Sequence, residues 1–381
     1  ATTSATAAIP PPRAPEPELA KRLRAGDPRW TAWLDRAEEL RLQILVRPLS
    51  PEAPAQRYRV DAEYVYPASA IKLFLAVAAL NILNEKVEGE LPWNTRFMRC
   101  RDDKGGCEPP REDIDESVPE TEDGKRKHQK LRVGLEIQKL LSWSDNDAYN
   151  RLWDMVGHAE ANAEMARLGF SSVRLHHKMN AKPELSLKTL RVTLLPPGMR
   201  GVVSKRRVSD TALAPTDAAR LLVGKAYNDE GKLVEEPLDF GTKNYASLED
   251  LQRLLLSVVR PDHPDAVALR LTDDQRAQLV KAMTRDPTHP AAAEHGPLLP
   301  GVVEALGKDN LRYISKSGRA YGFHLENAYL ENTSNGHAAL VTAVVYANPN
   351  AVLNDDDYAY DETSRPLLAS LGEELARRLL R

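Results

Sequence analysis

Segments with the pattern of β-strands lie only near the two ends of this chain, and helical patterns fill the long stretch between them. Near the N-terminus, residues 40–49 and 56–66 alternate between apolar and polar positions. Near the C-terminus, residues 311–315, 323–330 and 338–346 alternate or run apolar. Strands far apart in sequence pair most economically in one antiparallel sheet. We therefore predict an α+β fold in which an all-helical domain is inserted into a sheet domain.

The helical patterns complete this prediction. Amphipathic helices at residues 17–39, broken near Gly26, and at 366–380 would cover the sheet. Further helices are predicted at 131–141, 148–156, 159–168, 214–227, 247–259 and 272–283, whereas 173–207 reads as irregular. We expect a disordered leader at 1–17, a sheet domain at 18–67 and 305–381, and a helical domain at 68–304 with extra segments at about 94–130 and 224–270.

Composition and charge exclude several classes of function. The 381 residues are 42% apolar and 28% charged with a formal net charge of -3, which is ordinary for a soluble globular protein and gives no sign of a nucleic-acid partner. No uninterrupted apolar run reaches transmembrane length. A zinc site is not expected, because two cysteines are too few and the nine histidines do not show metal-ligand spacing. We expect a monomer without metal or cofactor.

The N-terminus and the cysteines bear on the compartment. The Ala-, Thr- and Pro-rich leader lacks an initiator Met, which suggests that a signal segment has been removed. Cys100 and Cys107 close a short Gly-containing loop, so a disulfide in an oxidising compartment is favoured. Secretion or a periplasmic location is therefore expected. Two free thiols in a cytosolic protein are the alternative.

Ser69 and Lys72 stand at the start of the longest apolar run in the chain, which continues to Leu80. A polar residue after a proline and before helix-forming residues is typical of a helix N-terminus. Residues three apart share one face of a helix, so the hydroxyl and the amine can meet there. Such a pair at the positive end of a helix dipole is a plausible activated nucleophile. The alternative is an N-cap serine with a surface lysine one turn later.

Two further motifs supply partners for this pair. S-D-N at residues 144–146 falls between two predicted helices, and K-S-G at residues 316–318 follows the predicted strand 311–315. S-D-N is expected by chance in roughly one such chain in ten or fewer. Alone, the first motif is usually a helix-capping turn and the second a strand-ending turn. Together, in the order S-x-x-K, S-D-N, K-S-G, they favour a catalytic constellation.

This ordered set resembles that of the penicillin-recognising serine hydrolases, most closely the class A β-lactamases. The resemblance covers nearly the whole mature chain, including the terminal strands, the last helix and the all-helical insert. It implies a β-lactamase/transpeptidase-like fold, a reaction without cofactor, and a small-molecule or peptidoglycan-type substrate.

The resemblance also implies roles for the motif residues. Ser69 would be the acylated nucleophile, and Lys72 would accept its proton if burial and cationic neighbours such as Lys316 lower the pKa of Lys72. Ser144 would relay the proton to the leaving nitrogen, and Asn146 would hold the amide carbonyl of the substrate.

The third motif would bind the rest of the substrate. Lys316 and Ser317 would hold a substrate carboxylate, and Gly318 would let the backbone of the substrate lie against the strand. The backbone N–H groups of Ser69 and Arg319 would form the oxyanion hole.

One family feature is missing from the sequence. Class A enzymes release the acyl group with a Glu in a Glu-x-x-Leu-Asn loop, and the corresponding stretch here is Lys182-Pro183-Glu184-Leu185-Ser186. Lys182 occupies the position of that Glu. Glu184 is the nearest acid, but two residues of extended chain displace a carboxylate by roughly 6–7 Å. Glu184 is therefore either a rearranged deacylation base or a solvated loop acid.

Three hypotheses on function follow. The first is a β-lactamase-like serine hydrolase acylated at Ser69, and the second adds slow deacylation, with a D-alanyl peptide or another ester or amide as the true substrate. The third is a covalent sensor or binding module that is acylated without turnover and uses residues 224–270 to contact a partner.

Overall fold

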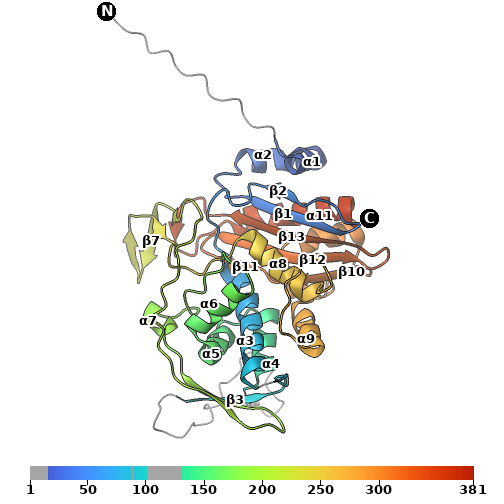
Figure 1. Ribbon diagram of the computed structural model, residues 1–381. Coiled ribbons are helices and arrows are strands. Elements are labelled where there is room, and N and C mark those ends of the chain that lie inside the picture. Colours follow the sequence, from blue (N-terminus) through green and yellow to red (C-terminus); the bar gives the residue numbers. More distant parts are fainter. Residues whose placement is uncertain (1–15, 88, 101–130) are drawn as a thin grey trace, which may run out of the picture.

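The computed structural model describes residues 16–87, 89–100 and 131–381 (Figure 1). The predicted leader falls almost wholly outside these ranges, as do Cys107 and most of the charged segment 94–130. Cys100 is buried at the end of strand β3 (Arg96–Cys100), and its disulfide with Cys107 stays a prediction.

The predicted antiparallel sheet is confirmed. Its strand order is β10-β12-β13-β1-β2, with β11 paired to β12. N-terminal β1 lies beside C-terminal β13, in a register that sets Leu45 against Thr342. The strands are β1 (Gln43–Ser50), β2 (Gln56–Tyr58), β10 (Leu311–Ser315), β11 (Gly318–Ala320), β12 (Phe323–Asn332) and β13 (His337–Tyr346). β2 ends earlier than predicted because Arg59 and Asp61 have left-handed backbones, with φ of 52° and 66°.

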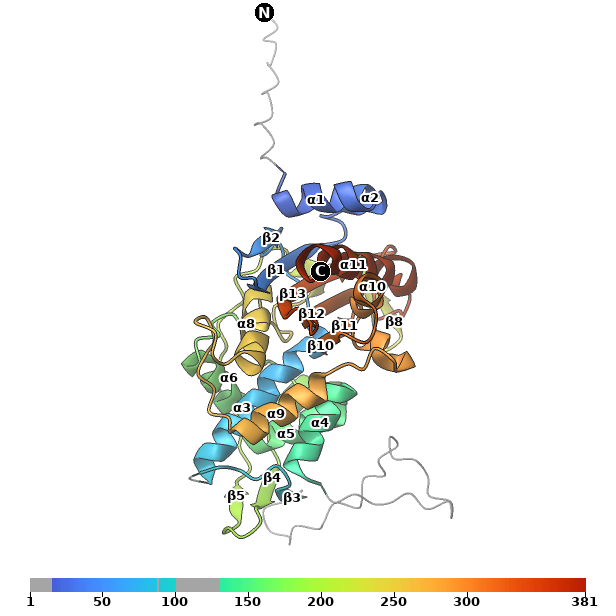
Figure 2. The same cartoon turned by 90° about the vertical axis from the view of Figure 1, so that its right-hand side faces the viewer.

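Alternation along β1 sends side chains to two separate cores. Ile44 and Val46 belong to the core under the terminal helices, whereas Leu45 belongs to the core shared with the helical part. The first core is covered by α1 (Glu18–Gly26), α2 (Arg29–Asp35), α10 (Leu299–Leu306) and α11 (Arg365–Leu379), which lie on one side of the sheet in Figure 2. The two predicted terminal helical segments are thereby confirmed.

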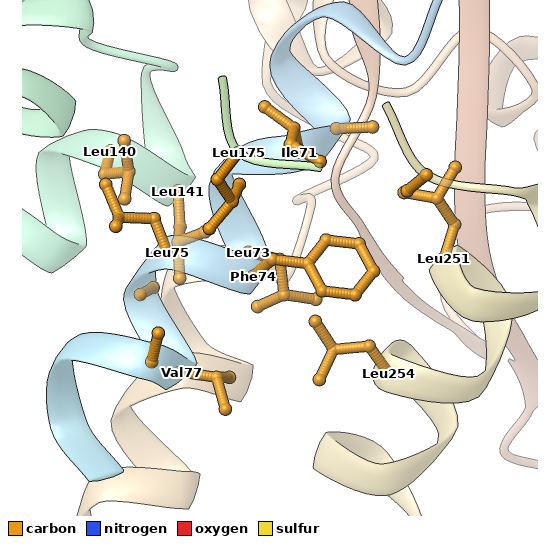
Figure 3. Close-up of a cluster of buried hydrophobic side chains, with 14 of the residues drawn as sticks. Ile71, Leu73, Phe74, Leu75, Val77, Leu140, Leu141, Leu175, Leu251 and Leu254 are labelled. Atoms are coloured by element: carbon orange, nitrogen blue, oxygen red, sulfur yellow. The ribbon is translucent and has the colours of Figure 1, made fainter. Parts of the chain in front are cut away.

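α3 (Lys72–Lys86) is the central helix of the second core. Phe74 and its neighbours pack against leucines of α4 (Val133–Ser142) and α8 (Leu248–Val259) (Figure 3), and apolar side chains are buried on all sides of α3. The stretch Ala68–Lys86 is long and apolar enough to cross a membrane, but 83% of its window is buried inside the protein, as expected for a core helix. Around it lie α4 (Val133–Ser142), α5 (Asn146–Val156), α6 (His158–Arg167), α8 (Leu248–Val259) and α9 (Asp273–Met283).

Local signals placed α8 and α9 correctly. Ser247 caps α8 by accepting a hydrogen bond from the Asp250 N–H, and Thr272 and Gln275 form a capping box at α9. α8 belongs to the predicted helical domain but also packs on the sheet, where Gln252 Nε2 donates to Leu45 O at 3.1 Å. Most of α10 also falls within the predicted helical domain, but this helix packs against α11 of the sheet domain. The domain boundaries at residues 68 and 304 stay a prediction.

The predicted helix at 214–227 is wrong. This segment is extended, with short strands β6 (Leu222–Val223) and β7 (Ala226–Asp229). Gly224 has a φ of 77°, and the Lys225 N–H donates to Ala351 O at 2.7 Å, which brings β7 beside β14 (Val352–Leu353). Pairing with residues more than a hundred positions away overrides the helical pattern. β8 (Lys232–Val234) and β9 (Leu238–Asp239) follow.

The segment 173–207, predicted as irregular, contains regular structure. It forms a one-turn helix α7 (Pro183–Ser186) and strands β4 (Arg191–Leu195) and β5 (Val202–Ser204). β4 pairs with β3, so residues from two predicted loop regions form a small sheet.

Candidate functional site

Ser69 lies in a short 3₁₀ turn, η1 (Ala68–Ile71), that leads directly into α3. Its side chain caps neither η1 nor α3, so the alternative of an N-cap serine is wrong. The residue is half-buried and lines a cleft. Its backbone N–H has no hydrogen-bond acceptor within the described part of the chain, as is usual for the first N–H groups of a helical turn. Both the hydroxyl and this N–H are thus available to a ligand.

Lys72 is fully buried, which excludes the alternative of a surface lysine. Its Nζ donates to Asn146 Oδ1 at 2.6 Å, to Ser144 Oγ at 3.2 Å, and to the Ser144 carbonyl. Burial lowers the pKa of Lys72 to about 7, and the charge of Asp145 only partly opposes this shift. Lys72 therefore has a large neutral fraction at neutral pH, as a proton acceptor requires.

Ser144 connects the second motif to both lysines. Its Oγ lies 3.2 Å from Lys72 Nζ and 3.1 Å from Lys316 Nζ. The residue has a φ of 60°, an uncommon conformation for a non-glycine residue, in the turn between α4 and α5. Asp145, beside it, accepts a hydrogen bond from the Ala148 N–H at 2.7 Å and caps α5. Asp145 is therefore structural, Ser144 is the member of the motif that contacts both lysines, and Asn146 contacts Lys72.

Lys316 follows β10 and is also buried. Besides Ser144, its Nζ donates to the Ser317 carbonyl at 2.9 Å. Burial holds the pKa of Lys316 well below its ordinary value, and the positive charges of Lys72 and Arg285 lower it further. Ser317 is buried beside it. The S-D-N and K-S-G motifs thus meet at one hydroxyl.

Gly318 is required by the turn that holds Ser69. A Cβ at this position would lie 2.1 Å from Pro67 O and 2.8 Å from Ser69 N. No side chain fits there, because both contacts are with backbone atoms. β11 therefore packs directly against η1, and this contact sets Arg319 beside Ser69 at the cleft.

Arg285 joins the segments that carry the second and third motifs. Its Nη2 donates to Leu141 O at 3.0 Å and Ser315 O at 2.8 Å, and its Nη1 to Ser142 O at 3.2 Å. Ser142 lies two residues before Ser144, and Ser315 directly precedes Lys316. The side chain is 6% exposed. Sequence reasoning missed this residue, since an arginine in a loop after a helix carries no local signal of such contacts.

Glu326 on β12 is a buried carboxyl near this cationic group. Its Oε2 accepts from the Tyr313 hydroxyl at 2.6 Å, and its Oε1 accepts from the Asn327 N–H at 3.0 Å. Burial raises the pKa of Glu326 to about 7, opposed by the hydrogen bond from Tyr313 and the charge of Arg285. The charge of Glu326 in turn favours the protonated form of Lys316.

A cleft of about 480 Å³ opens at Ser69. Its lining combines residues of the predicted site with residues that the sequence did not indicate, because they converge from distant segments: Tyr66, Ala68, Ser69, Asn146, His177, Met179, Asn180, Arg319, Ala320, Tyr321, Asn354, Asp356, Tyr358 and Tyr360. The Asn146 carbonyl oxygen accepts from Lys72, which leaves its amide N–H groups for a ligand.

Glu184 lies elsewhere. Glu184 is an exposed residue of α7, and Lys182, directly before this helix, is exposed too. Neither residue lines the cleft. Ser186, at the expected position of the family Asn, is buried and accepts a hydrogen bond from the Lys178 N–H at 2.9 Å. The same loop brings His177, Met179 and Asn180 to the cleft instead. The assignment of Glu184 as deacylation base stays a prediction and gains no support from this placement.

His177 is the titratable side chain that this loop contributes to the cleft. Its Nδ1 lies 2.8 Å from Lys178 O and donates to it, so Nε2 is the bare nitrogen. Burial lowers the pKa of His177, which keeps the ring neutral at pH 7. Nε2 is buried and has no hydrogen-bond partner among residues 16–87, 89–100 and 131–381. No group of three or more His, Cys, Asp or Glu side chains in the described ranges is placed to hold a metal ion.

Comparisons with known proteins identify the family and the fold. The model of the Beta-lactamase enzyme family matches residues 30–379. Among solved structures, the class A β-lactamase of the last common ancestor of Gram-negative bacteria is 18% identical, with a TM-score of 0.51 over 94% of this chain and 97% of that chain. The β-lactamase of Streptomyces albus G is also 18% identical, with a TM-score of 0.51 over 92% and 98%.

A PBP-A mutant in an acyl-enzyme complex with penicillin G is 16% identical, with a TM-score of 0.50 over 94% of this chain and 95% of that chain. No curated protein matches the sequence. The structural likenesses establish the α+β β-lactamase-like fold, and the family model spans most of the chain. The chain therefore belongs to the beta-lactamase enzyme family and is a serine hydrolase of the penicillin-recognising type.

Proposed function

We propose that this protein is acylated at Ser69 by β-lactams or related amides and esters, and that it releases the acyl group slowly. The observation that carries the proposal is the shared hydroxyl of Ser144, which links the buried amines of Lys72 and Lys316. In acylation, neutral Lys72 takes the Ser69 proton while Oγ attacks the carbonyl carbon. The N–H groups of Ser69 and Arg319 stabilise the resulting oxyanion.

Collapse of the tetrahedral intermediate breaks the carbon–nitrogen or carbon–oxygen bond. Ser144 gives its proton to the leaving atom and receives the one held by Lys72, through the 3.2 Å hydrogen bond between them. Lys72 is then neutral again, and one acyl group is bound to Ser69. Lys316 and Ser317 bind an anionic group of the substrate.

Slow deacylation is proposed because, within the part of the chain that the structure describes, no suitable carboxylate lies at the cleft. Among the described residues, Asp356 is the one acid that lines it, and this side chain is exposed. Hydrolysis of the acyl-enzyme needs a base that holds a water near the ester carbon. A protein that is acylated stoichiometrically with little turnover, as in a covalent sensor, is the second candidate, and the exposed position of Glu184 favours it.

Intact-mass measurement after incubation with a β-lactam tests the proposal. We expect the protein to gain the mass of one β-lactam within minutes and Ser69→Ala to gain none. An adduct that survives this substitution, or no adduct with any β-lactam, D-alanyl peptide or ester, would refute it. Burst kinetics then separate the two candidates, since a sensor gives one product per site and a slow enzyme gives a steady rate after the burst.

A further inference from the structure

The proposed chemistry leaves a large part of the cleft unused. Tyr66, Tyr321, Tyr358 and Tyr360 line it together with Ser69, although none of them takes part in the proposed acylation. Tyr66 is buried, whereas the other three are partly exposed. These four residues, which we call the tyrosine wall, come from three separate segments of the chain. Aromatic rings exposed in a concave site next to a nucleophile need an explanation beyond the core.

Tyr321 occupies a position that disfavours its own residue type. It forms with Gly322 the two-residue turn between Ala320 and Phe323, which are paired in the β11–β12 hairpin. Both turn residues have positive φ, 56° and 81°. Turns of this type strongly prefer Asn or Asp at the first position, and a left-handed tyrosine costs roughly 1–2 kcal/mol. Turn formation therefore does not account for Tyr321, whose ring packs edge to face against buried Phe240, with centroids 5.5 Å apart, and also lines the cleft.

Tyr358 and Tyr360 are fixed by their hydroxyls. Tyr358 Oη accepts from the Asn354 N–H at 2.8 Å, and Tyr360 Oη accepts from the Gly322 N–H at 2.9 Å. The two ring centroids are 5.4 Å apart. Because both hydroxyls are held by the backbone, the rings lose little freedom when a ligand binds. Burial raises the pKa of Tyr358 to about 12 and that of Tyr360 further, so both phenols stay neutral.

Contacts among the other rings continue this surface. Tyr66 and Tyr321 lie edge to face, with centroids 5.4 Å apart. The Arg319 guanidinium carbon lies 5.3 Å from the Tyr360 centroid, so a cation covers one face of that ring. Asn354 and Asp356 are exposed and give the wall a polar rim. The cleft thus offers aromatic faces beside the reacting bond and polar groups further out.

We propose that the tyrosine wall is a subsite for an aromatic ring on the acyl part of the substrate. The inference rests on the proposed acylation of Ser69 and names the substrate class. Rings prefer offset or edge-to-face partners with centroids 4.5–7 Å apart, which tyrosine faces at a cleft provide. A sugar ring also stacks on aromatic faces and could accept hydrogen bonds from Tyr358 and Tyr360, whose hydroxyls each accept a backbone N–H but keep their own O–H donor. We assign an aryl or arylalkyl group because the surface beside Ser69 is aromatic, and the exposed polar side chains Asn354 and Asp356 lie at its rim.

Two penicillins that differ only in the side chain test the subsite. Benzylpenicillin carries a phenylacetyl group, and its methyl analogue carries an acetyl group. We expect benzylpenicillin to acylate the protein about tenfold faster in second-order rate constant, a factor that two aromatic contacts supply. Equal rates for the two penicillins would overturn the proposal.

Substitutions at Tyr321 provide matched variants. Tyr321→Asn removes the ring and restores the residue that the turn prefers, which offsets part of the packing lost with the ring, so the fold should persist. The rate ratio should then fall to about threefold or less, whereas Tyr321→Phe should keep it. A ratio unchanged in Tyr321→Asn refutes the subsite. If this variant does not fold, Tyr358→Leu tests the same ratio.

Binding to Ser69→Ala separates the subsite from the proposed function. Calorimetric titration of this variant should show tighter binding of benzylpenicillin than of the methyl analogue. If neither compound acylates the wild type but this difference remains, the acylation proposal fails and the subsite stands. If both acylation and the binding difference are absent, both are wrong.

Discussion

Lys72 and Lys316 donate hydrogen bonds to the same Ser144 hydroxyl, at 3.2 and 3.1 Å. Both amines are buried, and no carboxylate within the described ranges lies within 4 Å of either Nζ. Burial lowers the pKa of both amines, and the charge of Lys72 lowers that of Lys316 further. This arrangement supplies a neutral amine near pH 7, and the predictions below for Lys72, Ser144 and Arg285 depend on it.

The pKa of Lys72 sets the pH dependence of acylation. Because this pKa is lowered to about 7, Lys72 is mostly protonated at pH 5 and mostly neutral at pH 9. Only the neutral amine accepts the Ser69 proton. We expect the second-order acylation rate to fall roughly tenfold per pH unit below pH 6 and to level off above pH 8. Stopped-flow or intact-mass kinetics from pH 5 to 9 measure this profile.

Lys72→Arg is the matched variant for this profile, since arginine stays charged across the range. Its acylation should be about 10²–10⁴-fold slower than that of the wild type, without the rise near pH 7. A wild-type profile that is flat from pH 5 to 9 would show that Lys72 is not the proton acceptor.

Removing the shared hydroxyl should interrupt proton delivery to the leaving atom. Ser144→Ala leaves two buried amines without a common acceptor, and we expect acylation by a penicillin to slow about 10²–10⁴-fold. Ser334→Ala is a suitable control, because Ser334 lies in the β12–β13 turn and its hydrogen bonds to described residues are to Asn332. Rates within threefold of each other for these two variants would rule out the relay.

Arg285→Met should loosen the second and third motifs together. The substitution leaves the carbonyls of Leu141, Ser142 and Ser315 without their donors in a buried site, which costs about 1–3 kcal/mol for each unsatisfied group. We expect a lower free energy of unfolding, measured with urea, and slower acylation. Arg285→Lys keeps a cation and at most part of the contacts. Its free energy of unfolding should therefore lie between those of the wild type and Arg285→Met.

Loss of the Arg285 charge also acts on Lys316. That charge lowers the pKa of Lys316, so Arg285→Met should raise this pKa. Lys316 then stays protonated to a higher pH, so binding of an anionic substrate should also persist to higher pH. An unfolding free energy and a pH profile both equal to those of the wild type would contradict this role.

Gly318→Ala should separate β11 from the turn that holds Ser69. The added Cβ would lie 2.1 Å from Pro67 O, so one of the two backbone segments must move. We expect destabilisation of roughly 2 kcal/mol or more and at least tenfold slower acylation. Gly89→Ala is the control, since the nearest atom to its new Cβ is 4.0 Å away. Crystal structures or melting temperatures that show no change in Gly318→Ala would contradict this packing argument.

The acyl-enzyme should persist, and Glu184 should not determine its lifetime. Because Glu184 is exposed and away from the cleft, we expect Glu184→Gln to leave the deacylation half-life within twofold of the wild type. Asn180 lines the cleft with a left-handed backbone that Asp also tolerates, so Asn180→Asp should shorten the half-life about tenfold by placing a base there. If Glu184→Gln alone loses its acyl group much more slowly than the wild type does, Glu184 is the deacylation base.

Local chemistry in the sequence determined the framework of this protein. The capping residues of α8 and α9, the core helix after Lys72 and the alternation in β12 and β13 all act within a few neighbouring residues, so they could be predicted. The three motifs could also be found from their order along the chain. Where a segment depends on a distant partner, prediction failed, as at 214–227, which pairs through β7 with β14.

Only the tertiary structure decided which side chains share a cleft. Arg285 binds carbonyls on two segments that lie about 140 and 30 residues away in sequence. The tyrosine wall combines Tyr66, three residues before Ser69, with a residue of a hairpin turn and two residues of the segment before α11. The placement of His177 and Asn180 at the cleft, in place of Glu184, depends on the path of a whole loop. Each of these contacts arises from packing between distant parts of the chain, and no short stretch of sequence carries that information.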